Sequence, residues 1–159
     1  CQIADRQPGS MGQMPCPELK EHAGVWKFSE NKLNQKQSDG TMYATGIRSI
    51  VGMSWNNLDN SLYAMQHGRD DFTRTWSNLY TPWHSALLPS EEFLKVPEGS
   101  DSGWPYYYYD FMQGKKLLNP EYGGDGLHGW AVSQSVLVLV VTQFQGFERL
   151  NKKKKIENA

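Results

Sequence analysis

The sequence predicts an all-β fold, and three observations support this prediction. Short apolar segments recur about every ten residues, and clusters of turn-forming residues separate them. Aromatic residues make up 13% of the 159-residue chain, and the mean hydropathy of −0.65 is that of a globular protein with a polar surface. The spacing of the segments is typical of an antiparallel sandwich or a propeller rather than of alternating strands and helices.

Each expected strand follows from its local pattern of side chains. Residues 24–28 alternate apolar and polar positions, as half-buried strands do. In the second expected strand, Gly46 indicates a bulge or a close approach of two backbones. Turn-forming residues such as the run from Asn56 to Asn60 separate the later segments. Strands are therefore expected near residues 24–28, 42–49, 50–55, 61–66 and 92–97.

The stretch between the fourth and fifth expected strands has a different composition. Residues 67–90 are expected to be irregular, and Trp76, Tyr80, Trp83 and His84 are distributed along them. Irregular segments longer than about 15 residues are usually functional or disordered, and this one is too aromatic to be disordered. A long functional loop is therefore expected here.

Charge and hydropathy exclude two classes of partner. The chain has 16 basic and 17 acidic residues and a net charge of −1. Because four lysines lie in residues 151–159, residues 1–150 are acidic overall and offer no electrostatic surface for nucleic acid. The lysine run can contact an acidic surface, or it can simply be solvated. No apolar run approaches the ~18 residues of a membrane-spanning helix, so no membrane span is expected.

The two cysteines, Cys1 and Cys16, leave several interpretations open. In an oxidising compartment they can form a disulfide, whose loop closure is worth roughly 3 kcal/mol. They are too few for a zinc site. The chain begins with Cys1 and not with methionine. It is therefore expected to be a fragment, a processed mature form, or a lipoprotein whose Cys1 carried the lipid.

Individual side chains suggest chemistry, and each has a simpler interpretation beside it. Arg48 can clamp a carboxylate through both arms of its guanidinium, or it can lie on a solvated strand face. His67 can be a base or ligand, or a hydrogen-bonded loop histidine. Residues 70–71 and 91–92 carry four acidic side chains that can bind a hard cation or remain solvated. Residues 106–109, four consecutive tyrosines, can stack on a planar ligand or alternate between core and surface.

Five short motifs are more specific together than alone. They occur in the order YATGIR at 43–48, LYAMQHGRD at 62–70, EEFLKV at 91–96, GWPY at 103–106 and PEYGGDG at 120–126. This succession resembles the glucose/sorbosone dehydrogenase family, soluble quinoproteins that use pyrroloquinoline quinone (PQQ). Residues 1–9 and 15–19 are similar to the sorbosone-type branch of that family. The resemblance covers residues 1–126.

The resemblance implies a six-bladed β-propeller with PQQ and calcium at the mouth of its channel. At ~40–45 residues per four-stranded blade, residues 22–126 of the matched region 1–126 would supply only about two blades, with long irregular loops. Residues 127–159 match nothing in the family and are expected to be a divergent tail, a truncation or frameshift product. A piece of this size is expected to show little activity alone and to associate through uncovered sheet faces.

The implied function is oxidation of the hydroxyl or aldehyde of a sugar, an aldose or sorbosone, by hydride transfer to PQQ. Electrons would then pass to a quinone or cytochrome, and family members are typically periplasmic or secreted. The family's general base lies upstream of residue 1, so no residue of this chain is expected to be catalytic. The alternative is a non-catalytic propeller-derived module that binds glycans or proteins.

The resemblance also implies the residues that hold the cofactor and the calcium ions. Arg48 would grip the PQQ carboxylates, with Ser49, His67 and Arg69 as further cofactor-binding residues. The backbone carbonyls of Gly68 and Arg69 would hold the PQQ-bound calcium, which needs no particular side chain.

A second, structural calcium would draw on Glu92 and on Asp101. Three positions depart from the family pattern. Relatives usually have Asn at the position of Ser49, an aromatic residue at Ser102 and a cysteine at Tyr107.

Overall fold

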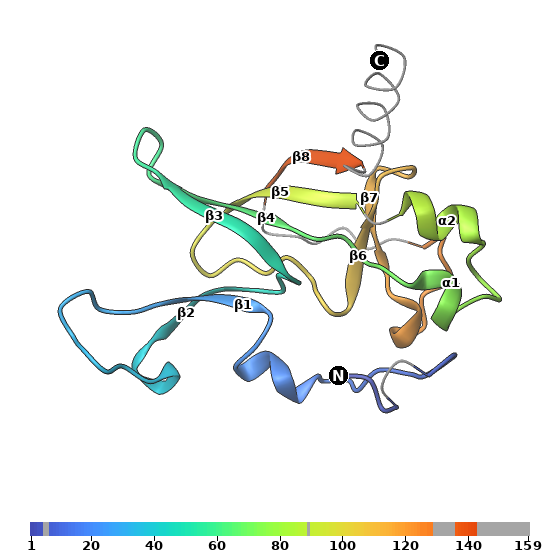
Figure 1. The fold of residues 1–159 in the computed structure, drawn as a ribbon, viewed down its shortest axis with the longest axis horizontal. Helices are drawn as coiled ribbons and strands as arrows, with labels where there is room; N and C mark the ends of the chain where they lie inside the picture. Colours follow the sequence, from blue (N-terminus) through green and yellow to red (C-terminus); the bar gives the residue numbers. More distant parts are fainter. Residues whose placement is uncertain (5–6, 89, 129–135, 143–159) are drawn as a thin grey trace, which may run out of the picture.

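The computed structural model describes residues 1–4, 7–88, 90–128 and 136–142, which form small antiparallel β-sheets with a few short helices (Figure 1). This architecture agrees with the predicted all-β class. The strands are β1 Gly24–Lys27, β2 Thr41–Thr45, β3 Ile50–Asn56, β4 Ser61–Gln66, β5 Ser90–Val96, β6 Tyr107–Asp110, β7 Lys115–Leu118 and β8 Val136–Thr142. The helices are α1 Phe72–Thr75 and α2 Pro82–Leu87, with 3₁₀ turns at Pro17–Lys20, Gln37–Asp39 and Pro120–Tyr122.

The largest sheet has the strand order β3-β4-β5-β8, and every neighbouring pair is antiparallel. In β4, alternate residues are buried, which places Leu62, Ala64 and Gln66 on the inner face. The strand β8 comes from the region after residue 126, where the family resemblance ends. It pairs with β5 from Ser90↔Thr142 to Lys95↔Val136.

The two-stranded sheet β1-β2 covers the inner face of the large sheet. The core between them consists of Val25, Ala44, Ile47, Leu62, Ala64, Leu94 and Val96. The predicted strand 42–49 is too long, because β2 ends at Thr45 and Gly46 follows with a φ of +70°. A Cβ on Gly46 would collide with the side chain of Asp101 and the backbone of Gly103. The expected close approach of two backbones is therefore present at Gly46.

The prediction that residues 67–90 are irregular is wrong in part, because α1 and α2 lie within them. Thr81 caps the N-terminus of helix α2, because its hydroxyl accepts a hydrogen bond from the His84 amide at 3.3 Å. Pro82 follows as the first residue of the helix. The two helices pack beside the β6-β7 hairpin around a second core, which consists of Phe72, Trp76, Tyr80, Leu88, Tyr108 and Leu117. Tertiary packing, rather than helix length, thus stabilises these short helices.

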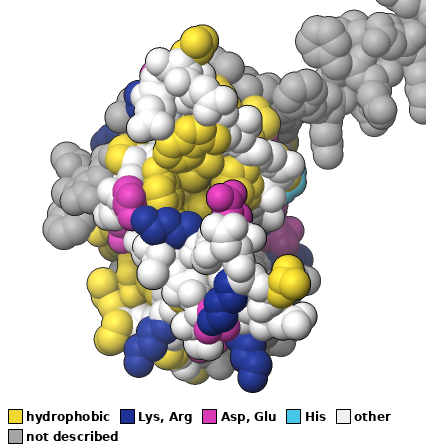
Figure 2. Space-filling model, turned by 90° about the vertical axis from the view of Figure 1, so that its left-hand side faces the viewer, with side chains coloured by type: hydrophobic (Ala, Val, Ile, Leu, Met, Phe, Trp, Pro, Cys, Tyr) yellow, Lys and Arg dark blue, Asp and Glu magenta, His cyan; other side chains and the backbone are white. Residues whose placement is uncertain are grey.

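The edge strand β3 of the large sheet exposes apolar side chains. Val51, Met53 and Trp55 alternate along β3 and are 53%, 55% and 45% exposed. Figure 2 faces the end of the molecule that carries β3 and shows hydrophobic side chains gathered between charged ones. Among the residues that the structure describes, no helix is long and apolar enough to cross a membrane.

Candidate functional site

Arg48 lies in the connection between β2 and β3, and four contacts fix it. Its backbone N–H donates to Oε1 of Gln66 at 2.8 Å. Its guanidinium donates to the Gly68 carbonyl at 2.6 Å and to Oδ2 of Asp70 at 2.7 Å. The guanidinium carbon also lies 5.4 Å from the centre of the Trp104 ring. The side chain remains 24% exposed, so it is held in place while one side stays open to a ligand.

Backbone hydrogen bonds place Trp104 beside Arg48. The loop after β5 runs along the end of β2, with the Thr45 amide donating to the Ser100 carbonyl at 2.9 Å and the Ser102 amide donating to the Thr45 carbonyl at 3.0 Å. The Trp104 amide then donates to the Gly46 carbonyl at 2.9 Å. Because Gly46 has no side chain, the loop approaches closely enough for the indole and the guanidinium to meet.

The turn after β4 supplies Gly68, and its two flanking residues point in different directions. Gly68 is buried, and its carbonyl accepts the Arg48 hydrogen bond. His67 is exposed, and its Nδ1 lies 2.9 Å from Oε2 of Glu91. The His67 amide donates to the carbonyl of Ser49 at 2.9 Å. Arg48 and Gly68 are therefore brought together, whereas the described contact of the His67 ring is with Glu91.

Arg69 is held by a buried ion pair. Its guanidinium pairs with Glu121, and the two side chains are 11% and 6% exposed. It also donates to the Asp70 carbonyl and lies 5.0 Å from the centre of the Phe72 ring. A buried guanidinium needs such a partner, because an isolated buried charge is costly. Arg69 thus joins the turn after β4 to the 3₁₀ turn at Pro120–Tyr122.

A cavity of about 710 Å³ lies against Arg48, Arg69 and Trp104. Its lining combines three guanidinium groups with four carboxylates and one indole ring. These residues are Arg48, Arg69, Arg74, Glu18, Asp70, Asp71, Glu121 and Trp104. Tyr122 also lines the cavity, and burial raises its pKa to about 12, so its hydroxyl stays protonated at neutral pH.

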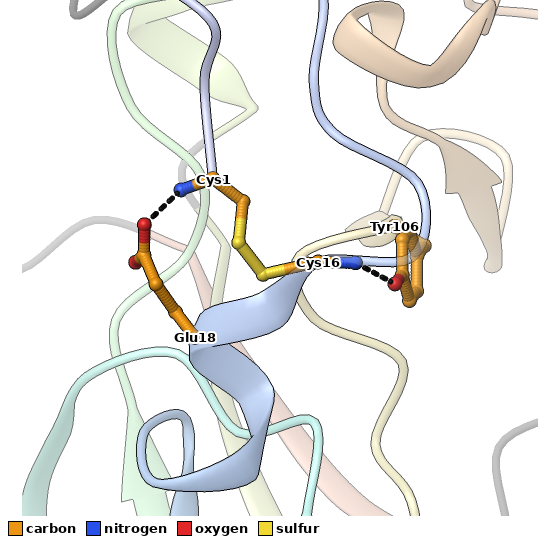
Figure 3. The surroundings of a disulfide bond; sticks show 4 residues. All are labelled: Cys1, Cys16, Glu18 and Tyr106. Carbon is orange, nitrogen blue, oxygen red and sulfur yellow. Dashed lines mark hydrogen bonds and ion pairs between the residues drawn. A yellow bond between two sulfur atoms is a disulfide. The ribbon is translucent and has the colours of Figure 1, made fainter.

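The N-terminal segment (residues 1–16) forms part of the cavity wall, and a disulfide between Cys1 and Cys16 closes it, with the Cα atoms 5.5 Å apart (Figure 3). The Cys16 amide donates to the hydroxyl of Tyr106 at 2.9 Å. The Gln2 side chain donates to Oε1 of Glu121 at 3.3 Å, and the Gly12 amide donates to the Glu121 carbonyl at 2.8 Å. The disulfide therefore anchors a segment that contacts the Arg69–Glu121 pair.

The two residues expected at the second calcium site have other described partners. Oδ1 of Asp101 accepts a hydrogen bond from the Gly103 amide at 2.7 Å. Oε1 of Glu92 accepts a hydrogen bond from Gln66 at 2.9 Å, and Oε2 lies 3.4 Å from Nζ of Lys116. Within the described residues, no group of three or more His, Cys, Asp or Glu side chains is close enough to hold a metal ion.

Burial determines the protonation behaviour of Glu92. The side chain is 5% exposed, and burial raises its pKa above the ordinary 4.5, against the opposing effects of Lys116 and Gln66. Together with Lys116, Glu92 forms a buried ion pair. Gln66 connects this pair to the Arg48 backbone.

Three side chains of the candidate site were not predicted individually from the sequence: Gln66, Lys116 and Glu121. Gln66 had a usable signal, because it is a polar residue at an inward position of an alternating strand. Glu121 and Lys116 had none, since their partners lie far away in the sequence.

No protein-family model, no curated protein and no solved structure matches this chain.

Proposed function

We propose that this chain is part of a soluble PQQ-dependent sugar dehydrogenase and contributes about two blades of a six-bladed β-propeller. The ordered motifs of residues 43–126 support this proposal. A blade of this fold is a four-stranded antiparallel sheet. The matched region supplies three antiparallel strands of such a sheet, β3, β4 and β5, and the fourth strand, β8, comes from the region after the resemblance ends. The substrate class is an aldose or sorbosone, a quinone or cytochrome accepts the electrons, and the location is periplasmic or extracellular.

The observation that carries the proposal is the pairing of the Arg48 guanidinium with the Trp104 ring on a cavity of about 710 Å³. Pockets for small ligands have volumes of roughly 300–1,000 Å³. PQQ is a planar tricarboxylic acid. A guanidinium fork binds a carboxylate through two parallel hydrogen bonds, and an indole stacks on a planar ring. The chemistry of both side chains therefore fits this cofactor.

Arg48 also connects the expected cofactor site to the expected calcium site. Its guanidinium donates to the Gly68 carbonyl, which is the oxygen that would face calcium. A cofactor carboxylate is a stronger acceptor than a carbonyl, so Arg48 turns toward it and leaves Gly68 for the metal. PQQ and calcium are therefore expected to bind together, each raising the affinity for the other.

The charge of the cavity supports this coupling. The lining carries three arginines and the Cys1 ammonium against four acidic side chains, so its charges balance and it does not favour a trianion alone. A divalent cation that binds with the cofactor reduces the net negative charge that the cavity must accept from three to one. Asp70 is 56% exposed and can turn into solvent when a ligand carboxylate replaces it at Arg48.

When bound, PQQ supplies a quinone that accepts hydride from the sugar, and calcium polarises the quinone carbonyl. The residues of this chain orient these groups. Arg48 would hold a PQQ carboxylate, and Arg69, paired with Glu121, would add positive charge to the cavity wall. Trp104 would exclude water from one face of the cofactor, and Gly68 would offer a backbone oxygen. No residue in the matched region is assigned the role of general base.

The proposal is tested by titrating PQQ into the chain with and without calcium while following the quinone absorbance. We expect saturable binding that strengthens at least about tenfold when calcium is added. Arg48→Ala should abolish this binding, whereas Lys27→Ala, on the exposed end of β1, should not change it. Absence of saturable PQQ binding to the correctly folded wild-type chain would refute the proposal.

A second candidate is a non-catalytic module that binds glycans or proteins. Trp83 at the start of α2 favours it, because the ring is 69% exposed and exposed aromatic side chains are enriched at interaction surfaces. The same preparation distinguishes the two functions. Glycan binding that Trp83→Ala removes, without any PQQ binding, would favour the second candidate.

A further inference from the structure

Lys116 on β7 is a buried cation that contacts oxygen atoms from two other parts of the chain. Its Nζ lies 3.4 Å from Oε2 of Glu92 on β5 and donates a hydrogen bond to the backbone carbonyl of Ser102. The side chains of Lys116 and Glu92 are 11% and 5% exposed. Lysine is rarely buried to this degree unless it is paired, so the burial of Lys116 depends on these two oxygen partners.

Both oxygen partners of Lys116 lead to the Arg48–Trp104 pair. Glu92 accepts a hydrogen bond from Nε2 of Gln66 at 2.9 Å, and Oε1 of Gln66 accepts the Arg48 amide at 2.8 Å. Ser102 precedes Trp104 by two residues in the loop after β5, which runs along the end of β2. One ammonium group therefore stabilises the segments that carry the guanidinium and the indole.

The oxygens around Lys116 are of the type that a hard cation binds. A carboxylate and a backbone carbonyl are common calcium ligands, and the family resemblance implies calcium at Glu92 and Asp101. The residues present do not fit that ion, because the ammonium of Lys116 already neutralises Glu92 and uses the Ser102 carbonyl. Asp101 is engaged separately, as an acceptor for the Gly103 amide.

We propose that the ammonium of Lys116 takes the place of a structural cation between Glu92 and Ser102. Accordingly, the wild-type chain binds no calcium at this position, and removal of Lys116 creates a site that does. Lys116 is also a positioning residue for Arg48 and Trp104. The inference does not depend on PQQ, since it concerns contacts within the chain.

The first test compares Lys116→Ala with Lys115→Ala, its exposed neighbour on the same strand. Loss of one partner from a buried ion pair is strongly destabilising, so Lys116→Ala should lower the Tm by on the order of 10 °C. About 5 mM calcium should then restore several degrees of Tm in Lys116→Ala, through binding to the folded state. Any rise in Tm that calcium causes in the wild type or in Lys115→Ala should persist when Glu92→Gln is added, because it would come from the Gly68 carbonyl and not from Glu92.

The second test locates the created site with terbium alone, whose luminescence tyrosine and tryptophan side chains sensitise. Lys116→Ala should gain a terbium signal that calcium displaces. The double variant Lys116→Ala/Glu92→Gln should lose that gain, because it lacks the carboxylate. If Lys116→Ala fails to fold, the stability of the double variant provides the test of the ion pair instead. It removes both charges of the pair and should therefore be more stable than either single variant, as expected for coupled partners.

The positioning role has a readout of its own. The amides of Arg48 and Trp104 are both hydrogen-bonded in the structure. Their hydrogen exchange should accelerate about tenfold or more in Lys116→Ala and slow again with calcium, while exchange in Lys115→Ala stays unchanged. Calcium binding to the wild type that Glu92→Gln abolishes, or no gain of metal binding in folded Lys116→Ala, would overturn the inference.

Discussion

The Arg48 guanidinium lies 5.4 Å from the centre of the Trp104 ring, and the two residues come from separate loops. The backbone of Gly46 brings them together, because its carbonyl accepts the Trp104 amide only two residues before Arg48. A cation over an indole face is stabilised electrostatically. The pair therefore places a fixed guanidinium beside an aromatic ring on the cavity wall, which is the combination proposed to bind a planar anionic ligand.

Trp104→Leu should weaken PQQ binding about tenfold, because it removes a stacking surface and a cation–π partner worth on the order of 1–2 kcal/mol. The affinity is measured by quinone absorbance in the presence of calcium. Trp83→Leu is the matched control, since that ring lies on α2 and does not line the cavity. Equal PQQ affinities for the two variants would show that Trp104 does not contribute to PQQ binding.

Replacing both cysteines by serine should lower the free energy of unfolding by about 3 kcal/mol in the chain-entropy model. Urea denaturation under oxidising conditions measures the difference. Because the N-terminal segment contacts Glu121 and lines the cavity, PQQ affinity should fall as well. Treatment of the wild type with a reductant should reproduce both changes. A reduced protein with unchanged stability and unchanged affinity would contradict this expectation.

Glu92 should make stability depend on pH in the acidic range. Burial raises its pKa in the folded protein above the ordinary 4.5, so the folded state holds this proton more tightly than the unfolded state. The contribution of Glu92 is therefore greatest below pH 4.5 and is lost as the pH rises through the folded pKa. Glu92→Gln should remove this slope from plots of unfolding free energy against pH.

Glu98→Gln is the control for this pH measurement, because the Glu98 side chain is 60% exposed and pairs with Lys27 at the surface. Exposed pairs contribute little to stability. If Glu92→Gln and Glu98→Gln give the same pH profile as the wild type, the buried carboxyl group does not couple to folding.

The exposed strand β3 should mediate self-association. It lies at one edge of the described sheet, contains no charged residue or proline, and presents Val51, Met53 and Trp55 on one face. Met53→Lys should shift the sedimentation profile toward monomer. Leu58→Lys, which adds the same charge at the 97% exposed turn, should not. A monomeric wild type at about 100 µM would contradict the prediction.

Strands β1 to β5 were predictable because their pattern is local, whereas β6, β7 and β8 were not among the expected strands. Residues 61–66 were expected to be a strand because turn-forming residues precede them, and the structure has β4 there. Their sequence does not alternate apolar and polar residues, so it did not predict that Leu62, Ala64 and Gln66 would be the buried ones. Gly46 was recognised as a close approach, but the identity of its neighbour, the loop at Asp101, depends on tertiary structure. Helix α2 had a readable start in Thr81 and Pro82, and its short length concealed it.

The candidate site was predictable only in part. Arg48 followed from its motif, and the structure surrounds it with Gly68, Asp70 and Trp104. The partners of Glu92 and Arg69 were not predictable, since Lys116 and Glu121 come from segments that only the folded chain brings near. Sequence spacing carries no information about such long-range ion pairs.

The central claim, that Arg48 and Trp104 bind the carboxylate end of PQQ, is tested most directly by an experimental structure of the chain with PQQ and calcium. The account predicts a PQQ carboxylate within about 3 Å of the Arg48 guanidinium nitrogens, with the indole of Trp104 against the cofactor ring. The Gly68 carbonyl should face calcium rather than Arg48. A cofactor bound elsewhere, with the Arg48–Gly68 hydrogen bond intact, would contradict the account.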